Sequence, residues 1–220
     1  MLFSRRRNNR PISFQDNDRG LVLYRYGSAT EDLPLTSGSL ILVAPGQHIF
    51  LMKGNELADV WDQGSYRLSP EMFPRLADTG AFRDRPNSPL EADLYYVSTE
   101  PITERKWATR TPALVQEAGQ VYRVRAYGTY DFRVHDVFSF ILDVFTDRGL
   151  KNTYEVVNFL NTRVAGAFTA TVSEMSLPVL EIINHPGEIS GLVKEKANRS
   201  LVGTGIEFIN VLIEGTSLPD

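Results

Sequence analysis

The sequence predicts an α+β fold, with mostly antiparallel strands in the N-terminal two thirds, then packed helices and a final strand. Two observations carry this prediction. Apolar and polar residues alternate in short runs as far as residue 134, which is typical of half-buried strands. From residue 137 the apolar residues recur every three or four positions, which is typical of helices. Because strands and helices are segregated along the chain, the pattern does not indicate an alternating α/β protein.

Short strands are expected in the first hundred residues, at 21–26, 39–44, 48–53, 56–61, 65–68 and 92–98. The third and fourth flank Gly54-Asn55 and predict a β-hairpin, because these residue types suit a tight two-residue turn. Ser69 and Pro70 suit the cap and first position of a short helix that ends near Ala77. Residues 78–91 then indicate a long surface loop.

The most regular alternation runs from residue 120 to residue 134, after two short extended pieces at 105–110 and 113–117. Gly128 is expected to mark a bulge that shifts the phase of this strand. The apolar side is then continued by Tyr130, Phe132 and Val134. Before the glycine, one face consists of Val121, Arg123, Arg125 and Tyr127, and the other of Tyr122, Val124 and Ala126.

Helices are expected at 137–145, from 152 to about 173, at 178–184 and at 188–202. Asn152 and Glu155 have the spacing of a capping box at the start of the second helix. Gly203 and Gly205 indicate the end of the last one. The strand that follows, at 206–213, has apolar residues on both faces and is expected to be buried.

Charge is unevenly distributed along the chain. The first ten residues carry four arginines and no acid, and because the whole chain has a net charge of −4, the remainder carries −8. Residues 1–19 are therefore predicted to form a flexible basic arm, too poor in apolar side chains to build a core. Residues 20–219 are expected to form one domain, with a sub-division near residue 135 where strands give way to helices.

Composition bears on the compartment and on several chemistries. The chain has no cysteine, which excludes disulfides, thiolate catalysis and cysteine-ligated zinc and fits a reducing compartment. No run of apolar residues reaches the length of a membrane span, and no apolar stretch follows the N-terminal arginines as a secretory signal requires. A cytoplasmic protein is therefore expected.

The sequence contains no pattern that predicts catalysis. The three histidines are His48, His135 and His185. In the sequence pattern, none of them is assigned an acid or a second histidine at the spacing of metal ligands. Gly203-Thr204-Gly205 lies between a helix and a strand, the reverse of the order in a nucleotide-binding turn. Asp143 and Asp147 lie one helical turn apart, which a solvated helix face explains at least as well as acid–base chemistry. No catalytic residue, metal ion or cofactor is predicted.

Arg123 and Arg125, beside Tyr122 and Tyr127, have the composition of a platform for single-stranded nucleic acid. A solvated strand face with cross-strand pairs explains the same residues. The acidic charge of the rest of the chain favours the second interpretation, so no nucleic-acid partner is expected.

The basic tip is the candidate membrane-surface site. An arginine near an anionic lipid surface contributes about 1 kcal/mol, so four contribute roughly 4 kcal/mol, or about millimolar binding. A single chain would bind weakly, whereas an array of chains would bind well. The alternative is an N-terminal segment without a role. The candidate residues are Leu2, Phe3, Arg5, Arg6, Arg7 and Arg10.

Several motifs in order along the chain carry a family resemblance. Residues 45–69 combine a turn, two strands and Gln63-Gly64-Ser65-Tyr66, and they are followed by Tyr95–Thr99, Lys106–Thr109 and Val124–Val134. The end of the chain adds Gly205–Phe208 and Ile213–Pro219. Together, over roughly residues 20–219, they resemble the SPFH domain of stomatins, prohibitins, flotillins and HflK/C proteins, and in particular a bacterial, virion-core-like branch related to membrane stress.

This resemblance implies a non-catalytic scaffold or adaptor domain rather than an enzyme. It implies self-assembly into homo-oligomers and peripheral association with the inner face of the cytoplasmic membrane. The partners it implies are an integral membrane protein or an anionic lipid surface, and a protease or stress protein. The implied roles are membrane organisation and the envelope stress response.

Two departures from the family pattern are expected to matter for assembly. The sequence shows no N-terminal membrane hairpin, and it ends at Leu218-Pro219-Asp220, where a coiled coil begins in many members and a zinc-binding tail often follows in this branch. A truncated form, lacking the strongest oligomerisation element, is therefore expected. The alternative function is a phage or virion structural protein that assembles without lipid. A hydrolase has almost no support from the sequence.

Overall fold

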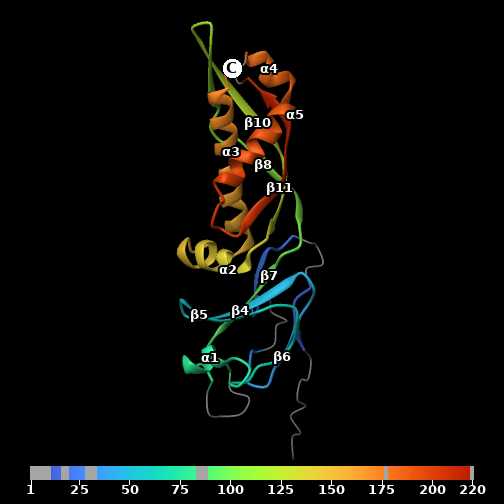
Figure 1. The fold of residues 1–220 in the computed structure, drawn as a ribbon, viewed down its shortest axis with the longest axis vertical. Helices are drawn as coiled ribbons and strands as arrows, with labels where there is room; N and C mark the ends of the chain where they lie inside the picture. Colours follow the sequence, from blue (N-terminus) through green and yellow to red (C-terminus); the bar gives the residue numbers. More distant parts are fainter. Residues whose placement is uncertain (1–10, 16–19, 28–33, 83–88, 176–177, 219–220) are drawn as a thin grey trace, which may run out of the picture. The chain divides into compact units, whose positions relative to one another are not determined.

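The structure, a computed structural model, describes residues 11–15, 20–27, 34–82, 89–175 and 178–218. It confirms the α+β class, with mostly antiparallel strands, several helices and a C-terminal strand. The chain forms two compact units, Met1–Thr99 and Glu100–Asp220. Residue 135, where a sub-division is expected, lies within the second unit. Figure 1 shows the elements of both units.

Two sheets build the first unit. One has the order β1-β3-β6 and the other β2-β7-β4-β5. They share a hydrophobic core to which Ile41, Leu51 and Tyr96 contribute. The expected hairpin is present, because Met52 pairs with Leu57 across the turn. The strands are β1 (Ile12–Ser13), β2 (Leu23–Arg25), β3 (Leu40–Val43), β4 (Gln47–Lys53), β5 (Glu56–Trp61), β6 (Gly64–Arg67) and β7 (Asp93–Ser98).

One part of the expected arm belongs to this core. Ile12 is 3% exposed and pairs in parallel with Ile41. The ring of Phe14 stacks on Tyr24 with 4.2 Å between the ring centroids. The expectation of an arm without a core is therefore wrong for these residues, because the two apolar side chains insert singly into a core that other strands supply. Residues 1–10 and 16–19 lie outside the described part of the chain.

The short helix of the first unit begins later than expected. Helix α1 spans Pro74–Asp78, whereas Ser69 accepts backbone hydrogen bonds from Met72 and Phe73 in a preceding turn. No side chain of its own N-cap closes the helix. Instead, the buried carboxylate of Asp59 on β5 accepts a hydrogen bond of 2.9 Å from the Leu76 N–H. A contact from another strand therefore sets the position of this helix.

A four-stranded sheet with helices on one face forms the second unit (Figure 1). The central strand β10 pairs with β11 along one edge, and with β9 and β8 along the other. Helices α3 and α5 pack against each other, α5 also packs on β11, and α3 packs on β9 and β8. The strands are β8 (Ile102–Ala108), β9 (Ala113–Glu117), β10 (Gln120–Val134) and β11 (Ile206–Ser217).

The helices of this unit follow the sequence pattern closely. They are α2 (Val137–Ser139), the π-helix η1 (Phe140–Asp147), α3 (Thr153–Glu174), α4 (Val179–Asn184) and α5 (Pro186–Arg199). Asn152 caps α3 as expected, since its Oδ1 accepts a hydrogen bond of 3.0 Å from the Glu155 N–H. The Glu155 carboxylate reaches the Lys151 N–H, one residue before the position that a capping box predicts. The helix expected at 137–145 is present, but most of it has π-helical geometry.

The alternation of β10 continues through Gly128 without a change of phase. Burial alternates strictly from Val124 to Val134, so the expected phase shift is wrong. A register shift does occur at Gly128, but the extra residue lies on β11, where Gly128 pairs with Ile213 and Tyr127 with Gly215. A second shift places another extra residue, Ile209, on β11. Ile209 and Leu212 are exposed, so this strand is less buried than its sequence predicts.

Candidate interaction surfaces

The predicted membrane-surface residues cannot be placed in the fold. Leu2, Phe3, Arg5, Arg6, Arg7 and Arg10 all lie outside the described residues. The sites that the structure does describe are in the second unit: a sheet face that its helices do not cover, and a pocket beside β9.

Exposed apolar side chains lie on the sheet face opposite the helices. Val121 and Tyr127 of β10 are 58% and 54% exposed, and Leu212 of β11 is 42% exposed. The even-numbered residues of β10 point to the helices and are mostly buried, which leaves the odd-numbered ones on the uncovered face. Apolar side chains that share one exposed face of a sheet are typical of a surface that another molecule covers.

Polar pairs occupy the other half of this face. Arg133 Nε lies 2.6 Å from Glu207 Oε1, in an ion pair between opposed residues of β10 and β11. Thr129 Oγ1 and Glu214 Oε1 are 3.0 Å apart. Within the described part of the chain, Arg123 and Arg125 at the other end of β10 form no ion pair. The face is therefore charge-paired at one end and basic at the other.

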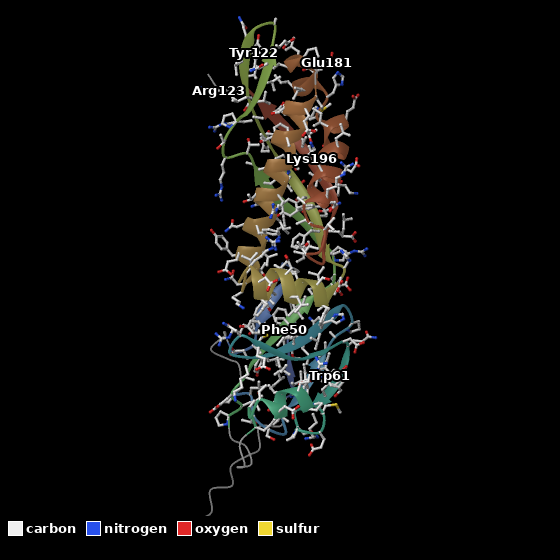
Figure 2. All side chains as sticks on the ribbon, turned by 60° about the vertical axis from the view of Figure 1, so that its left-hand side comes forward. Phe50, Trp61, Tyr122, Arg123, Glu181 and Lys196 are labelled. Carbon is white, nitrogen blue, oxygen red and sulfur yellow. The ribbon has the colours of Figure 1, made fainter. Side chains whose placement is uncertain are left out.

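The two tyrosines beside these arginines lie on opposite faces of the sheet. Tyr127 is on the uncovered face, whereas Tyr122 is half-buried on the helix side, where its hydroxyl donates to Gln120 Oε1 at 2.8 Å. Figure 2 labels Tyr122 and Arg123 at this end of β10. A stacking platform needs its aromatic rings on one surface. The geometry therefore favours a solvated strand face with cross-strand pairs over a platform for single-stranded nucleic acid.

The outer edge of β11 is sealed by side chains of α5. Asn198 accepts a hydrogen bond of 2.7 Å from the Phe208 N–H and donates one of 3.0 Å to the Phe208 carbonyl. The Ser190 hydroxyl accepts a hydrogen bond of 3.0 Å from the Ile213 N–H. Asn198 thus mimics the backbone of a neighbouring strand. Such capping prevents an exposed edge from pairing with another chain.

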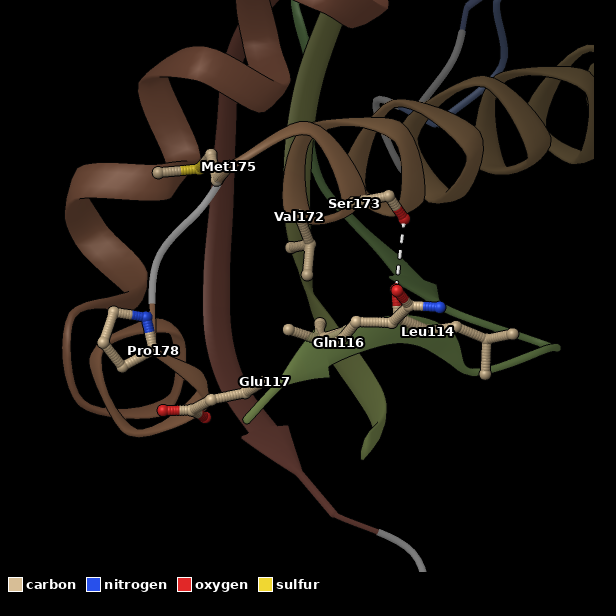
Figure 3. Close-up of a pocket in the computed structure, with 8 residues that line it drawn as sticks. Leu114, Gln116, Glu117, Val172, Ser173, Met175 and Pro178 are labelled. Atoms are coloured by element: carbon tan, nitrogen blue, oxygen red, sulfur yellow. Dashed lines mark hydrogen bonds between the residues drawn. The ribbon is translucent and has the colours of Figure 1, made fainter. Parts of the chain in front are cut away.

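The strand at the other side of the sheet, β9, has a pocket beside its outer edge (Figure 3). The pocket has a volume of about 410 Å³, within the ~300–1,000 Å³ of small-ligand sites. Glu117 lies in its wall and its Oε2 accepts a hydrogen bond of 3.0 Å from the Val179 N–H at the start of α4. The lining consists of Leu114, Val115, Gln116, Glu117, Val172, Ser173, Met175 and Pro178.

Sequence patterns did not single out this pocket. Ala113–Glu117 is predicted only as an extended piece, and the end of α3 and the start of α4 contribute the other walls from more than fifty positions away. The sequence feature that points to this edge of the sheet is Ala118-Gly119. Both residues have positive φ and form a two-residue turn, so β9 and β10 make a hairpin and β9 is an edge strand of the sheet.

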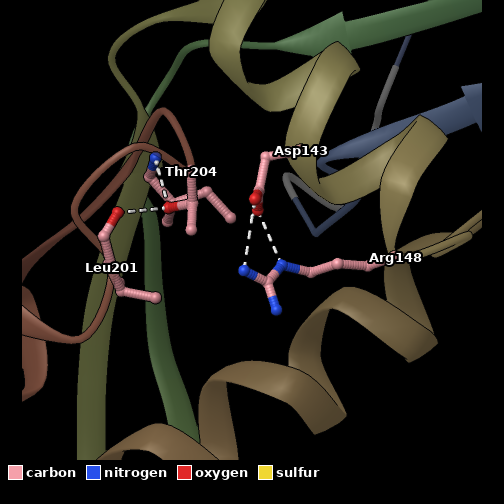
Figure 4. Close-up of polar contacts among 5 residues, drawn as sticks. Asp143, Arg148, Leu201 and Thr204 are labelled. Carbon is pink, nitrogen blue, oxygen red and sulfur yellow. Dashed lines mark hydrogen bonds and ion pairs between the residues drawn. The ribbon is translucent and has the colours of Figure 1, made fainter.

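The polar groups considered for catalysis have structural contacts. Asp143 forms a bidentate ion pair with Arg148, at 2.6 and 3.2 Å, which gives its carboxylate a structural role (Figure 4). Thr204 Oγ1 donates to the Leu201 carbonyl and accepts from the Ile206 N–H, which makes the Gly203–Gly205 segment a helix-to-strand turn. Among the described residues, no three side chains converge as metal ligands would.

The three histidines belong to different elements of the fold. His48 is half-buried in β4, and its burial lowers its pKa below the ordinary value. His135 is exposed just after β10. His185, between α4 and α5, lies 3.3 Å from Glu181 and 3.8 Å from Glu188, one helical turn away on either side. The expectation that no histidine has an acid at such a spacing is therefore wrong for His185. Each position suits a structural or surface role.

The continuous helical segment formed by α2 and η1 presents a second group of exposed apolar side chains. Phe138 and Leu142 are exposed one turn apart, while Phe140 and Val144 of the same segment are buried. The segment is anchored by Asp136, whose carboxylate accepts hydrogen bonds from the Ser139 hydroxyl and from two backbone N–H groups. These hydrogen bonds lower the pKa of Asp136, and the one from the Ser139 hydroxyl has the largest effect. None of the helices in the described ranges combines the length and apolar character of a membrane span.

Comparison with known proteins covers nearly the whole chain. A family model described as the SPFH domain-Band 7 family matches residues 23–220. The chain is also 27% identical over 167 residues to the uncharacterized protein YdjI of Bacillus subtilis (strain 168). That alignment covers 74% of this chain and 49% of YdjI, so the chain spans about half the length of this relative.

Proposed function

The chain belongs to the SPFH domain-Band 7 family, and we propose that it is a non-catalytic scaffold domain that self-assembles and associates with the inner face of the cytoplasmic membrane. The role would be in membrane organisation or the envelope stress response, with an integral membrane protein, a protease or a stress protein as partner. The family is one of membrane-associated scaffolds, and it provides the first support.

The uncovered sheet face of the second unit is the observation that carries the proposal. A sheet with helices on one face alone leaves the other to solvent or to another molecule. Here that face carries Val121, Tyr127 and Leu212, each more than two fifths exposed. Exposed aromatic and aliphatic side chains on a rigid sheet are suited to contact between copies.

Membrane association is proposed to depend on the basic tip. One chain with four arginines binds an anionic surface only at about millimolar concentration. Assembly through the sheet face would present many tips to one surface, and binding would then become multivalent. Self-assembly and membrane association are therefore expected to be coupled.

The mass of the chain in solution tests the proposal. We expect light scattering after size exclusion to give an assembly, or to give one once anionic vesicles are added. Replacing Tyr127 and Leu212 together by serine should reduce the assembly to monomers, whereas the matched change Val202→Ser, at an exposed residue in the α5–β11 turn, should not. A wild-type monomer that does not float with anionic vesicles would refute the proposal.

The basic tip is tested separately. Deleting residues 1–10 should abolish flotation with anionic vesicles while leaving the assembled mass unchanged. Vesicles without anionic lipid provide the control. Unchanged flotation after the deletion would show that the tip has no part in membrane binding. Assembly that is indifferent to lipid, together with capsid or tail genes beside this gene, would favour the alternative of a virion structural protein.

A further inference from the structure

Strand β9 has an outer edge whose backbone groups are directed away from the sheet. Glu117 and Gln120 flank the two-residue turn Ala118-Gly119, and residues in that position exchange both backbone hydrogen bonds across a hairpin. Hydrogen-bonded and non-hydrogen-bonded pairs alternate along an antiparallel ladder. The N–H and C=O groups of Leu114 and Gln116 therefore point outward.

Contacts around β9 agree with this assignment. The Leu114 carbonyl accepts a long hydrogen bond of 3.4 Å from the Ser173 hydroxyl (Figure 3). Because Ser173 belongs to α3 and not to the sheet, this carbonyl points away from β10. For the outward backbone groups of Gln116, the described residues supply no partner. The edge of β11, by contrast, is sealed at Phe208 and Ile213 by Asn198 and Ser190.

The pocket lies beside this edge, which is open at Gln116, and has a mixed lining. Val115, Val172 and Met175 contribute apolar walls. Glu117 is the one charged side chain among the described residues that line it, and its Oε2 is engaged by the Val179 N–H. Its Oε1 has no partner in the described part of the chain. The site thus combines an extended backbone edge, an apolar recess and a carboxylate oxygen.

We propose that β9 and this pocket bind an extended peptide segment of a partner protein, which adds as a strand to the outer edge of β9. Peptides that add to a sheet edge gain affinity from main-chain hydrogen bonds and specificity from pockets for alternate side chains. An apolar side chain occupies the recess, and a lysine or arginine two residues away lies next to Glu117. Charge complementarity selects a basic segment.

This inference rests on the proposed scaffold function, because it names the means by which the scaffold recruits a partner. It is independent of the sheet face that is proposed for self-assembly. The two can therefore fail separately, since the uncovered face carries Tyr127 and Leu212 whereas the peptide site is at the outer edge of β9.

The test uses the full chain and a defined peptide, acetyl-Thr-Leu-Thr-Lys-Thr-Val-Thr-amide. In an extended strand its leucine, lysine and valine share one side. We expect saturable binding, measured by fluorescence anisotropy of a labelled form, and slower amide hydrogen exchange in residues 113–117. The peptide with glutamate in place of lysine should bind more weakly. Two further peptides carry N-methyl groups at one or the other set of alternate residues, and only one of them should bind.

Two variants separate the main-chain and charge contributions. Gln116→Pro removes an outward N–H that the β9–β10 ladder does not use, and proline is tolerated at such edge positions. It should weaken binding of every peptide by at least about tenfold. Glu117→Gln keeps an oxygen for the Val179 N–H and should remove only the preference for lysine over glutamate, a change of about threefold to tenfold.

Several outcomes would overturn the inference. Equal binding of both N-methylated peptides, unchanged exchange in residues 113–117, or unchanged affinity of Gln116→Pro would each do so. If residues 113–117 are protected without peptide and Gln116→Pro lowers the mass of the assembly, the edge binds a second copy and the partner proposal is wrong. Lost peptide binding with intact assembly and vesicle association would overturn this inference alone.

Discussion

Trp107 on β8 donates a hydrogen bond of 3.2 Å from its indole Nε1 to the Leu212 carbonyl on β11, although β10 lies between the two strands. Trp107 pairs directly with Gly128 of β10. A glycine there allows the indole and the carbonyl to meet across the strand, because a Cβ at this position would lie 2.0 Å from the Leu212 oxygen. Three strands are thereby joined at one point of the sheet.

Replacing Gly128 by alanine should therefore be strongly destabilising. The new methyl group collides with backbone rather than with a flexible side chain, so we expect the free energy of unfolding to fall by about 2–4 kcal/mol. Urea unfolding followed by circular dichroism measures the change. The matched control is Gly166→Ala in α3, where a Cβ meets nothing within 4 Å, and this change should stabilise the chain by about 0.5–1 kcal/mol. A similar loss at both positions would contradict the explanation.

Trp107→Phe keeps an aromatic ring in the core and removes the indole N–H. The Leu212 carbonyl then loses its donor, and we expect a loss of about 1–2 kcal/mol, part of it from the smaller ring. Loss of this hydrogen bond should affect only the backbone near Leu212. Amide hydrogen exchange should become faster around residues 211–214, and a uniform change along the chain would show that only packing was lost.

Asn198→Ala should both destabilise the second unit and open the β11 edge. Two hydrogen bonds to the Phe208 backbone are lost, at a cost of about 1–3 kcal/mol. The neighbouring change Arg199→Ala removes only an exposed ion pair with Glu195 and should cost less than about 0.5 kcal/mol. Chemical denaturation gives both values, and light scattering should show new association in Asn198→Ala alone.

His48 should make stability depend on pH in the weakly acidic range. Its burial lowers its pKa in the folded state, so the unfolded chain binds the proton more readily. The resulting stability is present above the unfolded pKa of about 6.5 and is lost as the pH falls through the folded pKa. In His48→Gln, the free energy of unfolding should fall less between pH 7 and pH 5 than in the original chain. Parallel pH profiles would contradict this assignment.

Local patterns in the sequence were enough to predict most elements of the second unit. The alternation over Gln120–Val134 predicts β10 at its observed bounds, and the Asn152 cap predicts the start of α3. Both signals are local, because side-chain periodicity and cap chemistry depend on residues within a few positions. The hairpin around Gly54-Asn55 was predictable for the same reason.

Features that depend on distant residues were not predictable from the sequence. Helix α1 begins at Pro74 because Asp59 of another strand caps it, and Ile12 is buried because β3 offers it a parallel edge. The bulge near Gly128 was predicted on the wrong strand, since the glycine marks a close approach while the extra residue belongs to β11. The pocket beside β9 requires walls from α3 and α4, which no local pattern brings together.

The asymmetry between the sealed edge of β11 and the open edge of β9 limits how copies of the second unit can grow into larger structures. A fibril that grows by pairing strands needs two free sheet edges on every subunit. A subunit with one blocked edge can pair with only one other copy, so growth by strand pairing stops at a dimer. Any ring or lattice with more members must be built from contacts between surfaces, and the Asn198 amide is the safeguard against fibrous aggregation.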